Sequence, residues 1–257
     1  MLHLRNFELE NDFIQDKDNL VYPNVSYIAE KDILHYMKNK EYEFVDLGLP
    51  SGLKWAACNI GATKPEESGL YFAWGEDKGY VVTPEGDAYE GSYHAVITNA
   101  DGSQTEKTFA RNFSDYKYYD VATSAFTKYN ATDGLTRLEN EDDGCYLTEN
   151  NMRMPTNDDF VELIVNTTSA WTTNYNGSGI KGCTLTSKTN GNSIFLPAVG
   201  AVGIGELIGL GYEGGFWSST LSSSSVGEAA VFLFSSDDLG LMAGLRFGGA
   251  PLRAVRP

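Results

Sequence analysis

The hydrophobic positions near the C-terminus predict a strand with two apolar faces. In AAVFLF, at 229–234, Ala230, Phe232 and Phe234 recur at the two-residue period of a β-strand and are expected to face a core. Val231 and Leu233 then point to the opposite face. This second apolar face has two explanations: it is exposed and binds a partner, or another part of the chain covers it.

The same pattern of short apolar runs extends over most of the chain. From Tyr42 onward, turns rich in Gly, Pro and Asn separate runs such as FVDLGL, GLKWAAC, LYFAWG and SIFLPAVG. This pattern predicts a loop-rich, mainly β domain. The segment 83–112 is expected to form an inserted surface hairpin or a long loop.

Two helices are expected between these strands. The first lies within LTRLENEDDGCYLTENN and the second within PTNDDFVELIVNTT. In the second, Thr156 is a candidate N-cap and Asp159 completes a capping-box pattern. Phe160, Leu163 and Ile164 share one face, which we expect to be buried.

The N-terminal segment has a different character. Residues 1–41 are rich in charge and contain a possible strand, NVSYIAE, and a short helical stretch, KDILHYMKNK. We interpret residues 1–41 as an attachment or oligomerisation arm. Residues 42–257 form the expected ligand-binding domain, and the arm offers a route to a homo-oligomer.

Composition and charge exclude several classes of protein. The 257 residues are 42% hydrophobic, which is sufficient for a sizeable core. Nineteen basic and 35 acidic residues give a net charge of -16, which repels phosphate backbones and anionic lipids and argues against nucleic acid as a partner. No apolar stretch is long enough for membrane insertion, and the acidic start lacks the apolar core of an export signal, so we expect synthesis in a cytoplasm.

The candidate chemistry contains no predicted catalytic residue, metal ligand or cofactor site. Three cysteines without a CxxC spacing indicate buried thiols rather than a zinc cluster, and the histidines are scattered. No GxSxG or phosphate-loop motif occurs. The four tryptophans are expected to be core aromatics: Trp55, Trp74, Trp171 and Trp217.

Several motifs together resemble a known family. EFVDLGLPSGLKWAACNIGATKPEESGLYFAWGE, MRMPTNDDFVEL, TTNYNGSGIKGCTLTSKTNGNSIFLPAVG, GFWSST and LRAVRP follow one another between residues 42 and 257. In this order they resemble the Fibrobacter succinogenes major paralogous domain family. The resemblance implies an α+β, C-type-lectin-like fold with paired N- and C-terminal strands, two helices and a loop-rich ligand face. FVDLGL and PLRAVRP are then the strands expected to pair.

The composition of the tail suggests how a ligand face would arise. Residues 216–257 contain no Asn, Tyr or Lys, whereas all 18 Asn and 15 Tyr lie before Phe216. Members of the resembled family, like other lectin-fold proteins, are targets of diversity-generating retroelements, which replace adenines in a C-terminal coding segment. Such rewriting would remove Asn codons; the alternative is a chance absence.

On the rewriting hypothesis, some tail residues are fixed and others form an exposed, variable binding surface. Trp217, Glu228 and Met242 cannot arise from rewritten Asn codons and are expected to be scaffold. The predicted ligand-binding residues, with Arg246 as a cationic anchor, are Ser222, Ser224, Val231, Leu233, Ser235, Asp237, Asp238, Gly240, Ala243, Gly244, Leu245, Arg246, Phe247 and Ala250.

These observations favour a receptor-binding variable protein displayed on a phage tail or a cell surface, with a host-surface protein or glycan as its partner. A non-diversified bacterial adhesin or structural module is the alternative. A formylglycine-generating-type enzyme of similar fold is less favoured, because it needs a late cysteine pair and no cysteine follows Cys183.

Overall fold

The computed structural model describes residues 41–77, 79, 82, 113–149, 151–203 and 206–257, together with the backbone of four short strands. These four strands form two antiparallel hairpins: β1 (Phe13–Gln15) with β2 (Val21–Pro23), and β6 (His94–Thr98) with β7 (Gln104–Thr108). The hairpin expected within 83–112 is therefore present. The strand and helix expected within 24–40 lie outside the described residues, as does most of the proposed arm.

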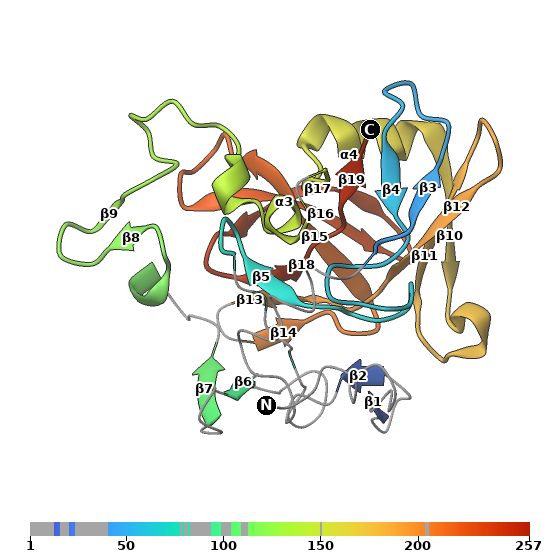
Figure 1. Cartoon of the computed structure of the whole chain (residues 1–257), viewed down its shortest axis with the longest axis horizontal. Helices are drawn as coiled ribbons and strands as arrows, with labels where there is room; N and C mark the ends of the chain where they lie inside the picture. The colour runs from blue at the N-terminus through green and yellow to red at the C-terminus, as the bar shows by residue number, and fades with distance from the viewer. Residues whose placement is uncertain are drawn as a thin grey trace.

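The expected α+β class is confirmed, with 13% helix and 37% strand. Figure 1 shows several small sheets around a shared interior. One three-stranded sheet joins both ends of the domain in the order β19-β4-β3. Its strands are β3 (Phe44–Asp46), β4 (Lys54–Ala56) and β19 (Val255–Arg256).

The pairing of the domain ends differs in detail from the sequence-based prediction. Val255 pairs with Trp55 of β4, and β3 pairs with the other side of β4. The FVDLGL segment and the C-terminal strand are thus in one sheet but are not direct neighbours. The GLKWAAC segment occupies the middle position because its Trp55 and Ala56 are fully buried.

Three further sheets complete the β structure. The sheet β14-β13-β18-β5 contains β5 (Tyr71–Ala73), β13 (Ala201–Gly203), β14 (Glu206–Ile208) and β18 (Gly249–Pro251). The sheet β10-β11-β12 contains β10 (Thr167–Thr172), β11 (Gly182–Ser187) and β12 (Ser193–Pro197). The sheet β15-β16-β17 contains β15 (Glu213–Leu221), β16 (Glu228–Ser235) and β17 (Leu239–Leu245). A small hairpin joins β8 (Tyr119–Asp120) to β9 (Ala125–Phe126).

Both expected helices are present. α3 is a short helix, Gly144–Thr148, whose N-cap is Asp143. α4 is longer, Asn157–Asn166, and begins with the predicted capping box between Thr156 and Asp159. None of the described helices is long and apolar enough to cross a membrane.

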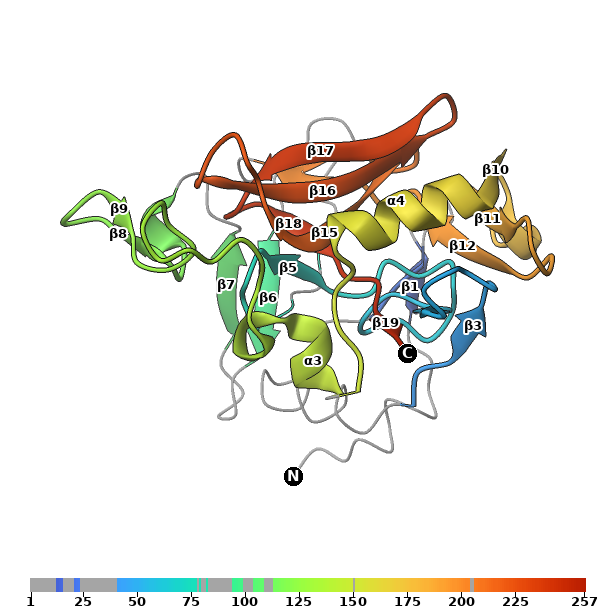
Figure 2. The same cartoon turned by 90° about the horizontal axis from the view of Figure 1, so that it is seen from above.

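The sheet β15-β16-β17 lies between two hydrophobic clusters. On one face, Phe232 stacks on Phe160 of α4 with ring centroids 4.8 Å apart, and Figure 2 shows α4 running across this side. On the other face, Val231 and Trp217 join a second cluster that includes Trp74 and Phe247. The second face of the AAVFLF strand is apolar because it packs inside the protein.

A buried arginine joins the C-terminal segment to the first strands. Arg253 is fully buried and donates from Nε to Asn59 Oδ1 at 2.9 Å and from Nη1 to the carbonyls of Ala56 (3.0 Å) and Ala57 (2.6 Å). Nη2 donates to Phe195 O at 3.0 Å. Burial lowers the pKa of this guanidinium to about 10, which still leaves it charged at neutral pH.

Replacing Arg253 with Met should lower the free energy of unfolding by about 3–5 kcal/mol, because it leaves buried carbonyl groups without donors. Chemical denaturation of the variant measures this loss. Arg256→Met is the matched control: Arg256 is half-buried and its guanidinium lies over the Phe44 ring at 4.1 Å, so a loss of only about 1 kcal/mol or less is expected. Equal losses in the two variants would contradict this role for Arg253.

Candidate functional site

Four of the predicted ligand-binding residues are buried, which corrects the prediction that they form an exposed surface. Val231 is 6% exposed, Phe247 4%, Ala250 1% and Arg246 0%. Val231 faces Trp217 and the second hydrophobic cluster, and Ala250 lies opposite Phe72 in the β18–β5 ladder. These residues contribute to packing and cannot contact a ligand in this structure.

Arg246 is a structural residue that binds the segment 113–130, and it is not a surface anchor. Its Nη1 donates to Val226 O (2.8 Å) and Tyr129 O (3.1 Å), its Nη2 to Lys128 O (3.1 Å) and its Nε to Tyr116 Oη (3.0 Å). The guanidinium also lies 5.0 Å from the Trp74 ring centroid and 4.7 Å from that of Phe126. The neighbouring Phe247 packs edge-on against Phe113 at 4.8 Å. The segment from 113 to 130 thus covers Arg246 and Phe247, which the rewriting hypothesis placed on the surface.

The other predicted residues are exposed or half-buried, but they fall in three separate places. Ser222 and Ser224 lie in the loop between β15 and β16, where their hydroxyls hydrogen-bond to each other at 2.8 Å. At the opposite end of β16 lie Ser235, Asp237 and Asp238. A third group lies on the strands themselves: Leu233 on β16, and Gly240, Ala243, Gly244 and Leu245 on β17.

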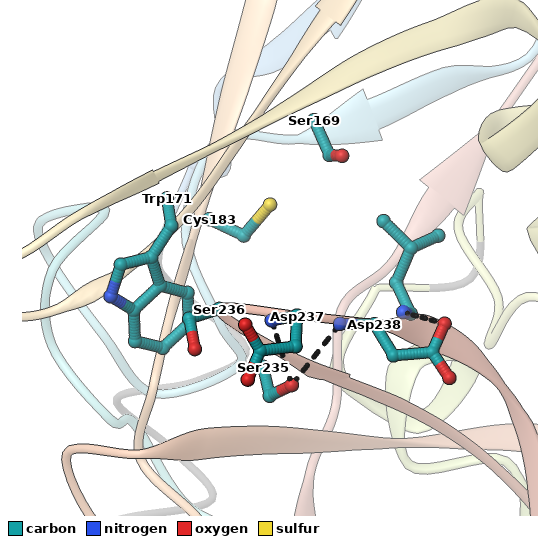
Figure 3. A pocket seen from close by; sticks show the side chains of 8 residues that line it. Ser169, Trp171, Cys183, Ser235, Ser236, Asp237 and Asp238 are labelled. Carbon is teal, nitrogen blue, oxygen red and sulfur yellow. Dashed lines mark hydrogen bonds between the residues drawn. The ribbon is translucent and has the colours of Figure 1, made fainter.

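The turn between β16 and β17 borders a pocket of about 200 Å³. Ser235–Leu239 line one side, and Ser169, Trp171 and Cys183 of β10 and β11 line the other. In Figure 3, Cys183 lies between Ser169 and the acidic turn, with the Trp171 ring to one side. This pocket is the candidate functional site, because it combines predicted ligand-binding residues with an aromatic surface.

The β10–β11 ladder explains one wall. Ser169 and Trp171 are two residues apart and therefore point to the same side of β10. Cys183 lies directly opposite Trp171 in the antiparallel pair. Trp171 is half-buried and packs against the border of the core, whereas the other three tryptophans lie fully inside it, as predicted.

The turn that forms the other wall is held by its own side chains. Ser235 Oγ accepts from Asp237 N–H at 3.2 Å and from Asp238 N–H at 3.3 Å, and Asp238 Oδ1 accepts from Leu239 N–H at 2.8 Å. Among the residues that the structure describes, none forms a hydrogen bond or ion pair with the Asp237 carboxylate. Asp237 is therefore held by its backbone while its charge remains available to a ligand.

The chemistry of the pocket favours recognition. Burial raises the pKa of the Cys183 thiol, so the neutral, weakly nucleophilic form predominates at pH 7. Hydroxyls, carboxylates and an indole line the pocket beside this thiol, and the lining residues include no His, Lys or Arg that would stabilise a thiolate. The lining groups offer hydrogen bonds, negative charge and an aromatic surface.

A second polar cluster, around Asp142, has a structural role. One carboxylate oxygen each from Glu139, Glu141 and Asp142 lie within 4.8 Å of one another, a spacing that would suit a metal ion. Lys128 Nζ already lies 2.6 Å from Glu139, 2.7 Å from Glu141 and 2.6 Å from Asp142. The ammonium group contacts all three carboxylates, so the cluster is a salt-bridge network.

Two acidic residues near the helix starts bond to the backbone or to a neighbouring cation. Asp143 accepts hydrogen bonds from Cys145 N–H and Met154 N–H, and Asp159 pairs with Arg153 at 2.6 Å. Burial raises the pKa of Asp143 to about 6. Asp142 differs, because it is buried and bonded to side chains instead of capping a helix.

Comparison of the chain with protein-family models, with curated proteins and with solved structures finds no match. The candidate site therefore depends on its own geometry. Sequence analysis identified the acidic turn but missed Ser169, Trp171 and Cys183 as its partners. The alternation of Ser169 and Trp171 indicated a shared face, but only the tertiary contact between two sheets shows what that face meets.

The Asp142 network predicts a specific dependence of stability on pH. Burial raises the pKa of Asp142, but hydrogen bonds from Lys128, Tyr118, Tyr129 and Lys117 lower it by more, to about 2. Because the folded-state pKa lies below the unfolded value of 3.8, the stabilisation is present above about pH 4 and lost as the pH falls through 2. The stability advantage of the wild type over Asp142→Asn should shrink by about 2 kcal/mol across this interval.

Denaturation at several pH values between 5 and about 2 measures this difference. The Asp143 titration, between about 6 and 4, is common to the wild type and the variant and therefore cancels in their difference. Ser223→Ala is the control: Ser223 is exposed and carries no titratable group, so its difference from the wild type should stay constant over this pH range. An Asp142→Asn difference that does not change with pH would refute the assignment.

Proposed function

We propose that this protein is a non-catalytic recognition module that binds a neutral glycan at the pocket between the β16–β17 turn and the β10–β11 ladder. The observation that carries the proposal is the placement of the available Asp237 carboxylate beside the half-buried Trp171. An indole surface packs against the C–H face of a sugar ring. The carboxylate oxygens accept hydrogen bonds from the sugar hydroxyls, and the serine hydroxyls both accept and donate such bonds.

The size and charge of the pocket support a small polar ligand. Its volume of about 200 Å³ is below the 300–1,000 Å³ typical of drug-sized ligand sites and suits a single sugar ring. The net charge of -16 and the acidic turn disfavour anionic ligands such as phosphate esters. A terminal neutral saccharide of a host-surface glycan fits both constraints.

A C-type-lectin-like fold and display on a phage tail or cell surface belong to the same proposal. The strand pairing of the domain ends and the two helices are compatible with the family resemblance. Affinity at one small pocket would be modest, so display in many copies would supply avidity. A fixed adhesin or structural module remains the alternative, and the pocket itself does not distinguish it from a diversified one.

Diversification, where it occurs, is limited by burial. Substitution at Val231, Arg246, Phe247 or Ala250 would disrupt a packed interior, whereas Asp237, Asp238, Gly240 and Ala243 make few contacts that the fold needs. The proposal therefore restricts the variable positions to the β16–β17 turn, the Ser222–Ser224 loop and those positions of the outer strand β17 that do not pack inward, which excludes Gly244, where a Cβ would lie 2.8 Å from Val231.

The glycan proposal predicts loss of binding in two pocket variants. Titration of a panel of neutral saccharides, followed by intrinsic tryptophan fluorescence and calorimetry, should identify a ligand. Trp171→Ala and Asp237→Asn should each weaken its binding at least about tenfold, through loss of the ring contact and of a charge-assisted hydrogen bond.

Asp158→Asn provides the matched control, because it removes an exposed carboxylate outside the pocket and should leave the affinity unchanged. Absence of saccharide binding by the folded wild type, or full affinity in Trp171→Ala, would eliminate the glycan assignment. Binding of a cationic peptide at this pocket would show that the pocket is a binding site but that its ligand is not a glycan.

The diversification hypothesis makes a separate prediction about natural sequence variation. Sequencing of this locus across a population, with its flanking DNA, should show a reverse-transcriptase gene and a near-copy template with adenines at the codons of exposed positions. Substitutions should occur at Asp237, Asp238 and Ala243 but not at Arg246 or Phe247. A locus without such a template would identify the fixed module instead.

A further inference from the structure

β17 is an outer strand that lacks the usual protection of a free sheet edge. Its sequence, LGLMAGL, contains no charged residue and no proline, and β16 is its only ladder partner among the described strands. The opposite outer strand, β15, is covered near both ends by bridges, Gly200 to Gly214 and Arg137 to Thr220. Native proteins usually block a long apolar edge with charges, prolines or bulges, because it accepts another strand.

Two backbone hydrogen bonds show which groups of β17 point outward. At the turn, Ser235 N–H donates to Asp238 O at 2.8 Å, and at the other end Arg246 N–H donates to Gly227 O at 3.1 Å. In an antiparallel ladder, alternate residues exchange hydrogen bonds with the partner strand. Every second residue between these two bonds directs its backbone N–H and C=O groups toward β16: Gly240, Met242 and Gly244. The residues between them turn their N–H and C=O groups to the free edge: Leu239, Leu241, Ala243 and Leu245.

Some of these outward groups already have partners within the chain. Leu239 N–H donates to Asp238 Oδ1 at 2.8 Å, and Leu245 O accepts from Gly248 N–H at 2.8 Å. Within the part of the chain that the structure describes, the backbone N–H and C=O groups of Leu241 and Ala243 form no protein hydrogen bond. The centre of the edge therefore offers two donors and two acceptors.

The sequence of the edge is nearly the same in both directions. When a second copy of LGLMAGL is laid antiparallel about Met242, Leu239 meets Leu245, Gly240 meets Gly244, and Met242 meets itself. Leu241 of each copy then meets Ala243 of the other, so the groups without partners pair with each other. An uncharged strand also matches an uncharged strand, whereas a charged partner strand would lose hydration there.

Met242 supplies a further observation at the centre of this arrangement. It is 61% exposed, the most exposed large hydrophobic residue in the described chain, and it lies opposite Val231 on the ladder. In the antiparallel arrangement Met242 forms a non-hydrogen-bonded pair with its own copy, where Cα atoms approach to about 4.5 Å and side chains are in contact. Pairing would remove both thioether side chains from water.

We infer that β17 is a self-association edge, at which two copies of this chain pair antiparallel about Met242 and join their sheets into one six-stranded sheet, β15-β16-β17-β17-β16-β15. The inference goes beyond the glycan site and does not depend on it. The strands β16 of the two copies would lie about 14 Å apart, which leaves room for an α4 helix above each half, since packed helices need only about 8–10 Å.

The length of the edge and the charge of the chain predict a weak dimer, and the geometry predicts that this dimer has two pockets. A seven-residue edge buries less than the roughly 1,000 Å² that stable association requires, and two chains of charge -16 repel each other at low salt. We therefore expect a weak dimer that strengthens toward an ionic strength of about 0.15 M. The two acidic turns would lie roughly 35 Å apart at opposite ends of the joint sheet, which gives a bivalent particle.

Charge variants at Met242 test the inference on the full chain. Sedimentation equilibrium should show a monomer–dimer equilibrium in the wild type, and its dissociation constant should rise at least about tenfold in Met242→Lys and in Met242→Glu. An equimolar mixture of these two variants should restore association, because residue 242 faces its own copy. Met242→Gln, which is uncharged, is the matched control and should still dimerise.

Disulfide trapping tests the register independently of affinity. Under mild oxidation, Met242→Cys should form a covalent dimer, whereas Ala243→Cys should not, because residue 243 faces residue 241 of the other copy. The wild type, with its three native thiols, sets the background. Circular dichroism confirms that each variant is folded.

Association that survives both charge variants, or covalent dimer formation as fast in Ala243→Cys as in Met242→Cys, would overturn the inference. A wild type that stays monomeric at the highest attainable concentration, together with no preferential trapping of Met242→Cys, would do so as well. The pocket variants Trp171→Ala and Asp237→Asn should leave the dissociation constant of the dimer unchanged, so the glycan proposal and the edge inference fail separately.

Discussion

Two buried guanidinium groups hold the C-terminal segment of this protein in place. Neither Arg246 nor Arg253 forms an ion pair within the described residues; both donate mainly to backbone carbonyls of distant segments. A buried charge is tolerated only when its donors are satisfied, so each arginine requires several loops to stay in register at once. Arg246 gathers the 113–130 segment over one side of the β15–β17 sheet, and Arg253 joins β4 to β12. The C-terminal segment thus holds the 113–130 segment, β4 and β12 in their relative positions.

This constraint decides which surfaces are available for function. Because α4 covers one face of the β15–β17 sheet and the second cluster covers the other, Phe232 and Val231 are both interior. What the sheet still presents to solvent is its perimeter: the acidic turn at one end, the serine loop at the other, and the edge of β17. The glycan pocket uses the turn and the self-association edge uses the strand, so the two proposed interactions do not compete for the same atoms.

Sequence patterns predicted the local elements well because local chemistry determines them. The capping box at Thr156, the alternation in 229–234 and the turn residues between strands depend on neighbours in the chain. Burial of Phe247 and Arg246 depends instead on the 113–130 segment, where Tyr116 lies more than one hundred residues from Arg246 in the chain, and burial of Val231 depends on Trp217 and the second cluster. Alternation shows that a strand has two apolar faces but contains no information about what covers each one. For the same reason, the sequence does not indicate that Trp171 on β10 lies near Asp237 in the turn between β16 and β17.

The rigidity of the acidic turn explains how a recognition site and a fixed scaffold can share one hairpin. Ser235 Oγ accepts from the backbone N–H groups of Asp237 and Asp238, so the turn conformation depends on the Ser235 side chain and on backbone atoms of these two residues. The side chain of Asp237 contributes no bond to this arrangement, and preorganisation therefore does not depend on its identity. Binding energy gained by a side chain at position 237 is not spent on ordering the loop. A side chain at position 237 therefore determines ligand specificity and contributes little to the stability of the fold. Substitutions at this position change which ligand is bound before they affect folding.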